Sequence, residues 1–171
     1  KMKLLFTLDS KNYDESIEVV SRPSARAIII KDKQIVMIHS EKHDFYKFPG
    51  GGIEDGEDPR DAMIREVREE AGLTVIPESI AEFGNVHRRS ITERGGLFIQ
   101  DNLYYICRCE DGRLEQLLDD YEAEERFTLE FVTPEVAIER NRISPAKKEN
   151  PNMLEREARV LELLISGGYL E

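Results

Sequence analysis

Residues 51–73 read GGIEDGEDPRDAMIREVREEAGL, and this stretch contains the strongest helix signal in the chain. Asp58 is a favourable N-cap, and Pro59 suits the first helical position because no amide donor is needed there. Gly72 is a typical C-terminal stop, since glycine adopts the left-handed conformation without steric cost. These signals predict a helix over Pro59–Ala71.

The acidic side chains of this predicted helix gather on one side. At about 100° per residue, Glu66, Glu69 and Glu70 fall in one patch beside the apolar stripe, with the small side chain of Ala62 among them. Like charges at these spacings destabilise a helix by about 0.2–0.5 kcal/mol per pair. A solvated charged face is the ordinary interpretation of such a helix. A metal platform is the alternative, because Mg²⁺ takes carboxylate oxygens as ligands.

The spacing of the surrounding residues favours the metal platform. Glu57 follows Gly51 after five residues, and Arg65-Glu66-Val67 follows after seven more; Glu69-Glu70 and Gly72-Leu73 complete the pattern. This pattern resembles the Nudix box, the signature of the Nudix hydrolase superfamily, at every defined position. The composition of the chain gives on the order of 10⁻⁶ accidental matches of this kind.

The flanks of the box agree with this resemblance. Phe48-Pro49-Gly50 leads into the box as in family members, and Phe131-Val132-Thr133-Pro134 is similar to the family's strand-to-helix step. A weaker resemblance extends over about residues 24–140. The sequence shows no signature of a particular subfamily, so the resemblance defines a reaction class and leaves the substrate open.

The resemblance implies a hydrolase that depends on Mg²⁺, with Mn²⁺ as an alternative, and that cleaves a nucleoside diphosphate linked to another moiety. The implied reaction is attack of a metal-activated water on a diphosphate phosphorus. The implied metal ligands are Glu57, Glu66, Glu69 and Glu70, of which Glu66 and Glu69 are also catalytic candidates. Arg65, a further catalytic candidate, is expected to orient these carboxylates rather than to bind metal.

A general base outside the box is expected in the acidic run at residues 119–125. Glu124 and Glu125 are the leading candidates, Glu122 is a third, and a glutamate of the box is the alternative. A solvated acidic loop is the other interpretation of this run.

Substrate contacts are expected from glycines and arginines. A loop formed by Gly50, Gly51 and Gly52 would let backbone amides approach phosphate groups closely. Arg26 is placed on a strand that precedes the box. Arg88 belongs to a basic segment at residues 87–96, for which an exposed hairpin loop is the alternative interpretation.

Strand signals outnumber helix signals in the rest of the chain. We predict strands over residues 2–8, 16–20, 24–30, 34–39, 45–48, 79–86, 97–109, 114–118 and 127–132. A short helix is predicted from Thr133-Pro134 to about residue 140, and a longer one over 152–165 whose apolar face contains Leu154, Ala158, Leu161 and Ile165. The fold class is therefore α/β, and the resemblance implies a Nudix-like α/β/α sandwich with a mixed β-sheet. We expect one domain over 1–171, with residues 1–23 as an N-terminal strand extension.

The composition excludes several classes of function. The chain has 35 acidic and 24 basic residues, and its formal net charge of −11 argues against a DNA-binding protein and against docking on an anionic membrane. The sequence has no apolar run that approaches the roughly 18 residues of a transmembrane helix. Cys107 and Cys109 are expected to be free thiols of a cytoplasmic protein. We expect a small nucleotide as the substrate, and a homodimer is compatible with the sequence.

Three functions remain after these exclusions. One is the hydrolysis of a nucleoside diphosphate derivative, and another is a nucleoside triphosphate pyrophosphatase of the 8-oxo-dGTP type. The third is a non-catalytic nucleotide-sensing module on the same fold, against which the presence of all four box glutamates argues. An RNA 5′-end pyrophosphohydrolase is disfavoured by the net negative charge.

Overall fold

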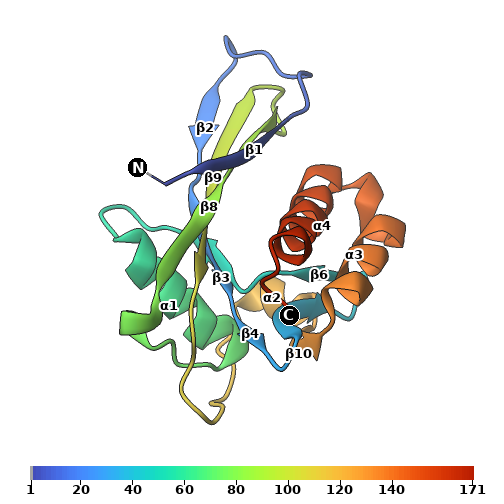
Figure 1. Ribbon diagram of the computed structural model, residues 1–171. Helices are drawn as coiled ribbons and strands as arrows, with labels where there is room; N and C mark the ends of the chain where they lie inside the picture. The colour runs from blue at the N-terminus through green and yellow to red at the C-terminus, as the bar shows by residue number, and fades with distance from the viewer. Residues whose placement is uncertain (1) are drawn as a thin grey trace.

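The computed structural model describes residues 2–171, and its strands form two sheets (Figure 1). The larger sheet is mixed. Its path runs through β1 (Leu4–Asp9), β8 (Ala81–Ile91), β9 (Leu97–Ile106), β3 (Ser24–Ile28) and β7 (Gly50–Gly52), and β2 (Val19–Ser21) also pairs with β9. The β8–β9 and β3–β7 pairs are antiparallel, whereas β1 runs parallel to β8, and β2 and β3 run parallel to β9.

The smaller sheet is antiparallel and is centred on β5 (Gln34–Ser40). β5 pairs with β10 (Phe127–Val132), β4 (Ile30–Lys31) and β6 (Phe45–Lys47). The register places Leu129 of β10 opposite Ile38 of β5, so two apolar side chains contribute to the same buried layer.

Helices cover both faces of these sheets. Figure 1 shows α1 (Pro59–Ala71) on one side, and α3 (Pro134–Ile143) with α4 (Pro151–Ser166) on the other. The short helix α2 (Asp120–Glu124) and the 3₁₀ turns η1 (Pro77–Ser79) and η2 (Pro145–Lys148) complete the elements. Met63 and Val67 of α1 belong to one buried cluster, and Val160 and Leu161 of α4 to another. The predicted α/β/α sandwich is therefore confirmed. None of the helices within residues 2–171 combines the length and the apolar composition that a membrane span requires.

The ends of α1 lie where the sequence predicts them. The Asp58 side chain accepts a hydrogen bond from the amide of Arg60 at 2.8 Å, which caps the N-terminus. Gly72 ends the helix in the left-handed conformation with φ of 70°, and its amide donates to the Arg68 carbonyl at 3.1 Å. Local signals alone therefore fix the helix that carries Glu66, Glu69 and Glu70.

The strand predicted over residues 114–118 is wrong, because this segment is an extended loop. It donates hydrogen bonds to the carbonyls that α1 leaves free at its C-terminus. The Leu114 amide reaches Gly72 at 2.7 Å, the Leu117 amide reaches Glu69 at 2.7 Å, and the Gln116 side chain reaches Glu70 at 2.7 Å. The loop thus caps the helix end instead of joining a sheet, and it brings α2 against α1.

Several other boundaries differ from the predictions, two of them at candidate site residues. The expected glycine loop at residues 50–52 is the short strand β7, whose Gly51 lies opposite Ala25 of β3. Half of the basic segment at 87–96 is strand, since β8 continues to Ile91 and residues 92–96 form the turn before Leu97. Arg88 lies opposite Gln100 of β9 as part of this pairing, so the side chain is held by the sheet and not by a loop.

The N-terminal strands extend the larger sheet. Figure 1 shows β8 and β9 as a long hairpin, with β1 and β2 beside its distal part. β1 pairs with β8, and β2 pairs with the opposite strand of the hairpin, β9. Both N-terminal strands therefore belong to the larger sheet.

The contact between Gly72 and the 114–118 loop can be tested by adding one methyl group. A Cβ at position 72 would lie 2.0 Å from the Leu114 carbonyl oxygen, whereas a Cβ at Gly112 would meet nothing within 4 Å. Both glycines have positive φ, so each alanine variant carries the left-handed strain of about 1–2 kcal/mol. Urea unfolding should show a larger loss of stability for Gly72→Ala than for Gly112→Ala. Equal losses would mean that the loop does not pack against the helix end.

Candidate active site

Three carboxylates meet at the junction of α1 and α2. Glu66 and Glu70 of α1 and Glu122 of α2 each place an oxygen within 4.8 Å of the others. We call these three residues the acidic patch. The helical wheel correctly places Glu66 next to Glu70, while Glu69 lies further out and is about one third exposed. The patch offers hard oxygen donors from two elements, which is the donor chemistry that Mg²⁺ and Mn²⁺ prefer.

Glu70 is the most buried member of the patch, with no exposed surface. Its carboxylate accepts hydrogen bonds from Lys47 Nζ at 2.6 Å and from the Gly50 amide at 3.1 Å. Burial raises the pKa of Glu70 to about 7, and Lys47 opposes that rise. The side chain therefore links α1 to β6 and β7 while keeping an unusually high proton affinity.

Arg65 holds the outer carboxylates. Its Nε and Nη2 donate to the two oxygens of Glu57, each at 2.9 Å, and its Nη1 donates to Glu66 at 3.0 Å. Nη1 also lies 3.5 Å from Glu69, and Nη2 donates to the Gly52 carbonyl at 3.2 Å. The bidentate contact lowers the pKa of Glu57 to about 2, while burial raises the pKa of Glu66. Two of the expected metal ligands, Glu57 and Glu69, thus contact Arg65 outside the acidic patch. The other two, Glu66 and Glu70, belong to the acidic patch.

The position of Glu122 depends on a capping box. The Asp119 side chain accepts from the Glu122 amide at 2.8 Å, and the Glu122 side chain accepts from the Asp119 amide at 2.9 Å. The Asp-x-x-Glu spacing that produces this box is visible in the sequence and predicts the start of a helix at this point. The sequence does not show that the 114–118 loop places α2 next to α1, so the position of Glu122 in the acidic patch could not be predicted.

The two leading candidates for a general base lie elsewhere on the same segment. Glu124 forms an ion pair with Lys42 and is largely exposed. Glu125 is buried, and one of its carboxylate oxygens lies 2.7 Å from His43 Nδ1. Both partners belong to the turn between β5 and β6, so these two carboxylates lie outside the acidic patch.

The glycines of β7 let the strand approach both neighbours. A Cβ at Gly50 would lie 2.3 Å from the Ala25 carbonyl oxygen, and its φ of 149° also favours glycine. A Cβ at Gly51 would lie 2.6 Å from Cδ of Glu66, whereas one at Gly52 would meet nothing within 4 Å. Gly51 therefore provides the space that the Glu66 carboxylate occupies.

A cavity of about 330 Å³ opens beside the acidic patch. Glu66, Glu69 and Glu122 line one part of it, together with Gly50, Gly51 and Gly52. Arg26 and Arg156 also line it, whereas Arg88 does not. Phe45 and Phe127 also line the cavity, and sequence reasoning missed both because nothing local distinguishes them from ordinary core aromatics.

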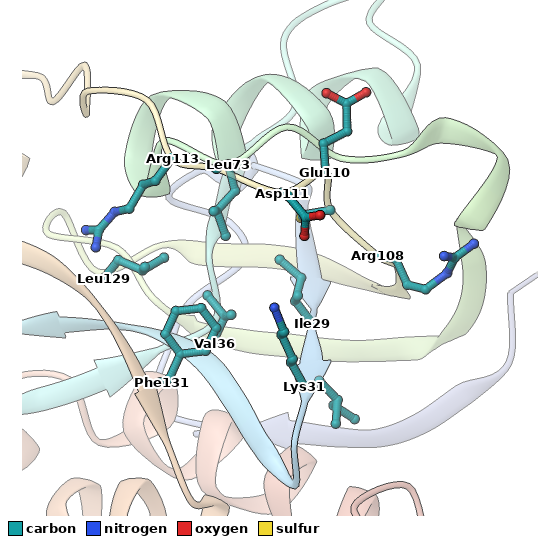
Figure 2. A pocket seen from close by; sticks show the side chains of 13 residues that line it. Ile29, Lys31, Val36, Leu73, Arg108, Glu110, Asp111, Arg113, Leu129 and Phe131 are labelled. Carbon is teal, nitrogen blue, oxygen red and sulfur yellow. The ribbon is translucent and has the colours of Figure 1, made fainter.

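A second cavity of about 340 Å³ lies near the C-terminal end of α1 (Figure 2). Leu73 points toward Val36, Leu129 and Phe131 across this hollow, and charged side chains such as Lys31 stand around it. It is mainly apolar, whereas Glu66 and Glu122 of the acidic patch line the other cavity. The acidic patch and its cavity are therefore the candidate active site.

The chain matches the family model of the NUDIX domain over residues 20–156. This match covers most of the sequence, and the chain therefore belongs to the Nudix family.

Relatives and solved structures agree with this assignment. The chain is 40% identical over 68 residues to an RNA pyrophosphohydrolase of a Nitratiruptor species, covering 36% of this chain and 43% of that protein. It is 32% identical over 97 residues to an RNA pyrophosphohydrolase of Halorhodospira halophila, covering 51% of this chain and 52% of that protein. The chain thus spans about half or less of the length of these curated relatives.

Two solved structures share the fold. The MutT protein of Bacillus halodurans matches with a TM-score of 0.56 and 20% identity, over 70% of this chain and 72% of its own. A Nudix hydrolase of Nitrosomonas europaea matches with a TM-score of 0.56 and 14% identity, over 82% of this chain and 89% of its own.

A pair of glycine variants tests the contact between β7 and Glu66. Gly51→Ala should displace the Glu66 carboxylate, which is the end of a flexible side chain, so the fold should survive while Mg²⁺ affinity falls about tenfold to a hundredfold. Gly52→Ala is the matched control and should bind Mg²⁺ like the wild type. Isothermal titration of both variants with Mg²⁺ makes the comparison. Equal affinities for the two variants would contradict the role of Gly51.

The raised pKa of Glu70 predicts a pH dependence of stability. The folded-state pKa is about 7, against about 4.3 for an unfolded glutamate. Between these values the folded state binds more protons, so the free energy of unfolding falls as the pH rises from about 4.5 to 7. Urea unfolding in EDTA between pH 5 and 8 should show a shallower fall for Glu70→Gln than for the wild type. Both proteins contain the same histidines, so their titrations cancel when the two free energies of unfolding are subtracted. If the free energy of unfolding changed with pH in the same way in both proteins, the raised pKa would not belong to Glu70.

Proposed function

We propose that this chain is a divalent-metal-dependent pyrophosphohydrolase that cleaves a diphosphate linkage in a small nucleotide. The observation that carries the proposal is the acidic patch, which sets Glu66, Glu70 and Glu122 within 4.8 Å of one another beside the cavity. Membership of the Nudix family supports the reaction class. The relatives that are named RNA pyrophosphohydrolases support cleavage of a phosphoanhydride.

The residues present fit Mg²⁺ or Mn²⁺. All three members of the acidic patch offer carboxylate oxygens, and no soft sulfur or imidazole ligand stands among them. We infer that Glu66 and Glu70 hold the metal, that Glu122 stands beside it, and that Glu69 and Glu57 are able to join from the Arg65 side. When bound, such an ion neutralises phosphate charge and acidifies a water molecule.

The protein's own groups have separate tasks in this proposal. Arg65 fixes the rotamers of Glu57 and Glu66, and so acts as a positioning residue. Lys47 and the Gly50 amide stabilise the ionised form of Glu70, which prepares it to bind a cation. Glu122 accepts the proton of the attacking water, because its carboxylate lies in the patch and lines the cavity. Glu124 and Glu125 are the alternative bases, and their present partners lie on the β5–β6 turn.

The preferred substrate is decided by a panel assayed with Mg²⁺ and, as a control, with excess EDTA. The panel contains a nucleoside triphosphate, an oxidised purine triphosphate, ADP-ribose, a nucleoside diphosphate sugar and a 5′-triphosphorylated RNA oligomer. Hydrolysis of at least one member that depends on Mg²⁺ is the expected result. Binding of a member without turnover would overturn the proposal in favour of a nucleotide-sensing module.

We also propose a cytoplasmic location. Both cysteines, Cys107 and Cys109, are free thiols in the structure, and thiols persist in reducing compartments.

Two glutamate variants separate the candidates for the general base. Glu122→Gln keeps an oxygen that can accept the Asp119 amide, so α2 should form while the proton acceptor is lost. We expect kcat to fall about 10²–10⁴-fold, the usual contribution of a positioned base. Glu124→Gln, the matched control, removes an exposed ion pair with Lys42 and should leave kcat near the wild-type value. The reverse order of effects would assign the base to Glu124.

A further inference from the structure

Three arginines gather between the larger sheet and α4. Arg26 comes from β3 and Arg88 from β8, and both strands pair with β9, at Tyr104 and Gln100 respectively. Arg156 comes from α4, is 1% exposed, and donates through Nη1 to Asn102 at 2.9 Å and to Gln100 at 3.3 Å. We call Arg26, Arg88 and Arg156 the arginine cluster.

The charges of the arginine cluster are only partly compensated. Within residues 2–171, Glu157 is the one carboxylate in ion-pair contact with any of the three guanidinium groups, at 3.2 Å from Arg156. Glu157 is itself fully buried and accepts the Tyr104 hydroxyl at 2.6 Å. Arg26 and Arg156 are buried and Arg88 is half-buried, so the three guanidinium groups exceed the single carboxylate in contact with them by two charges. Buried charges are ordinarily paired, because desolvation of an unpaired ion costs several kcal/mol.

Arg26 is the member whose hydrogen bonds are missing. It is 8% exposed, and its Nε and Nη1 are buried without a hydrogen-bond partner in the described chain. Nε of Arg88 is buried in the same way. Such unsatisfied groups are rare in native proteins, and an absent ligand is one of their ordinary explanations.

The uncompensated charge faces the candidate active site. Arg26 and Arg156 line the same cavity as Glu66 and Glu122 of the acidic patch. Guanidinium groups favour phosphate oxygens because their donors lie in one plane and match the spacing of those oxygens. One terminal phosphate monoester carries nearly two negative charges at neutral pH. It would therefore neutralise the two excess positive charges of the arginine cluster.

We propose that the arginine cluster binds a terminal phosphate of the substrate, so that the enzyme prefers nucleoside triphosphates over nucleotides whose diphosphate ends in a neutral sugar. This inference rests on the proposed function, since it names the substrate class of the same site. Arg26 and Arg156 contact the phosphate. Arg88 stands behind them over the Phe98 ring, at 5.5 Å from its centroid, and acts as a positioning charge.

Binding of an inorganic probe tests the cluster without any turnover. Thermal unfolding is measured in excess EDTA, with tripolyphosphate against sodium chloride of equal ionic strength. At about ten times its Kd, tripolyphosphate should raise the wild-type midpoint by about 3–6 °C. The control Arg94→Met, at the exposed β8–β9 turn, should keep this shift. A wild type without any shift would overturn the proposal.

The sign of the stability change separates a ligand-directed arginine from a structural one. Arg26→Met should give a free protein at least as stable as the wild type, because an uncompensated buried charge is removed, and it should lose the tripolyphosphate shift. Arg156→Met should lower the midpoint, because it leaves Glu157 buried and unpaired. An Arg26→Met protein that unfolds earlier, or does not fold, would make Arg26 a structural residue and overturn the proposal.

Turnover then identifies the source of the phosphate. With Mg²⁺, Arg26→Met should lower kcat/KM for a nucleoside triphosphate about tenfold to a hundredfold, and leave that for a nucleoside diphosphate sugar nearly unchanged. If Arg26→Met changed kcat/KM equally for both substrates, or for neither, the assignment to a terminal phosphate would be overturned. Free phosphate would then be the ligand of the arginine cluster. If the wild type hydrolyses no substrate of the panel, the proposed function fails while the tripolyphosphate titration still decides whether the cluster binds anions.

Discussion

A fully buried carboxylate, that of Glu70, determines how the elements around the cavity fit together. Its two partners, Lys47 and the Gly50 amide, come from β6 and β7, while its own backbone belongs to α1. Desolvation of an ion is costly, so all three elements must keep their positions for this charge to stay compensated. The backbone carbonyl of the same residue accepts the Gln116 side chain, which adds the loop that carries α2. One residue thus ties both helices of the acidic patch to both sheets.

The cavity that results is lined by groups of both charges, the carboxylates Glu66, Glu69 and Glu122 and the arginines Arg26 and Arg156. The acidic patch has more carboxylates than cations, and the arginine cluster has more guanidinium groups than carboxylates. Within residues 2–171 the two groups do not neutralise each other through a direct ion pair, since Arg26 forms none there and Glu66 pairs with Arg65. A cation alone would satisfy the acidic patch, and an anion alone would satisfy the arginine cluster. A polyphosphate chain that carries a divalent ion satisfies both, so the charge pattern matches a metal–phosphate complex better than either component.

Local rules are sufficient for one part of this structure and fail for another. The cap at Asp58, the proline at 59 and the left-handed Gly72 fix α1 within the chain itself, so its bounds are predicted to the residue. The 114–118 loop resembles a strand in sequence, but its amides pair with the end of α1, which is distant along the chain. The same limit applies to Glu122, whose place in the patch depends on that loop. On α4, apolar spacing predicts a buried face, yet the charged pair Arg156 and Glu157 is buried there. Charged residues are almost never fully buried unless paired. Asn102 of β9 accepts from Arg156 and Tyr104 of β9 donates to Glu157, and neither residue has a local signal for this role.

The N-terminal strands give the arginine cluster its support. The family match begins at residue 20, so β1 lies before it. β1 pairs with β8 at the position of Arg88, where Leu8 lies opposite. The next residue, Arg89, points to the other face of the strand and binds the Tyr13 hydroxyl and Glu15. β8 is therefore held by backbone pairing with β1 and β9 on its two edges and by the N-terminal segment on one face. This leaves the opposite face, with Arg88, free to turn its charge toward α4 and the cavity behind it.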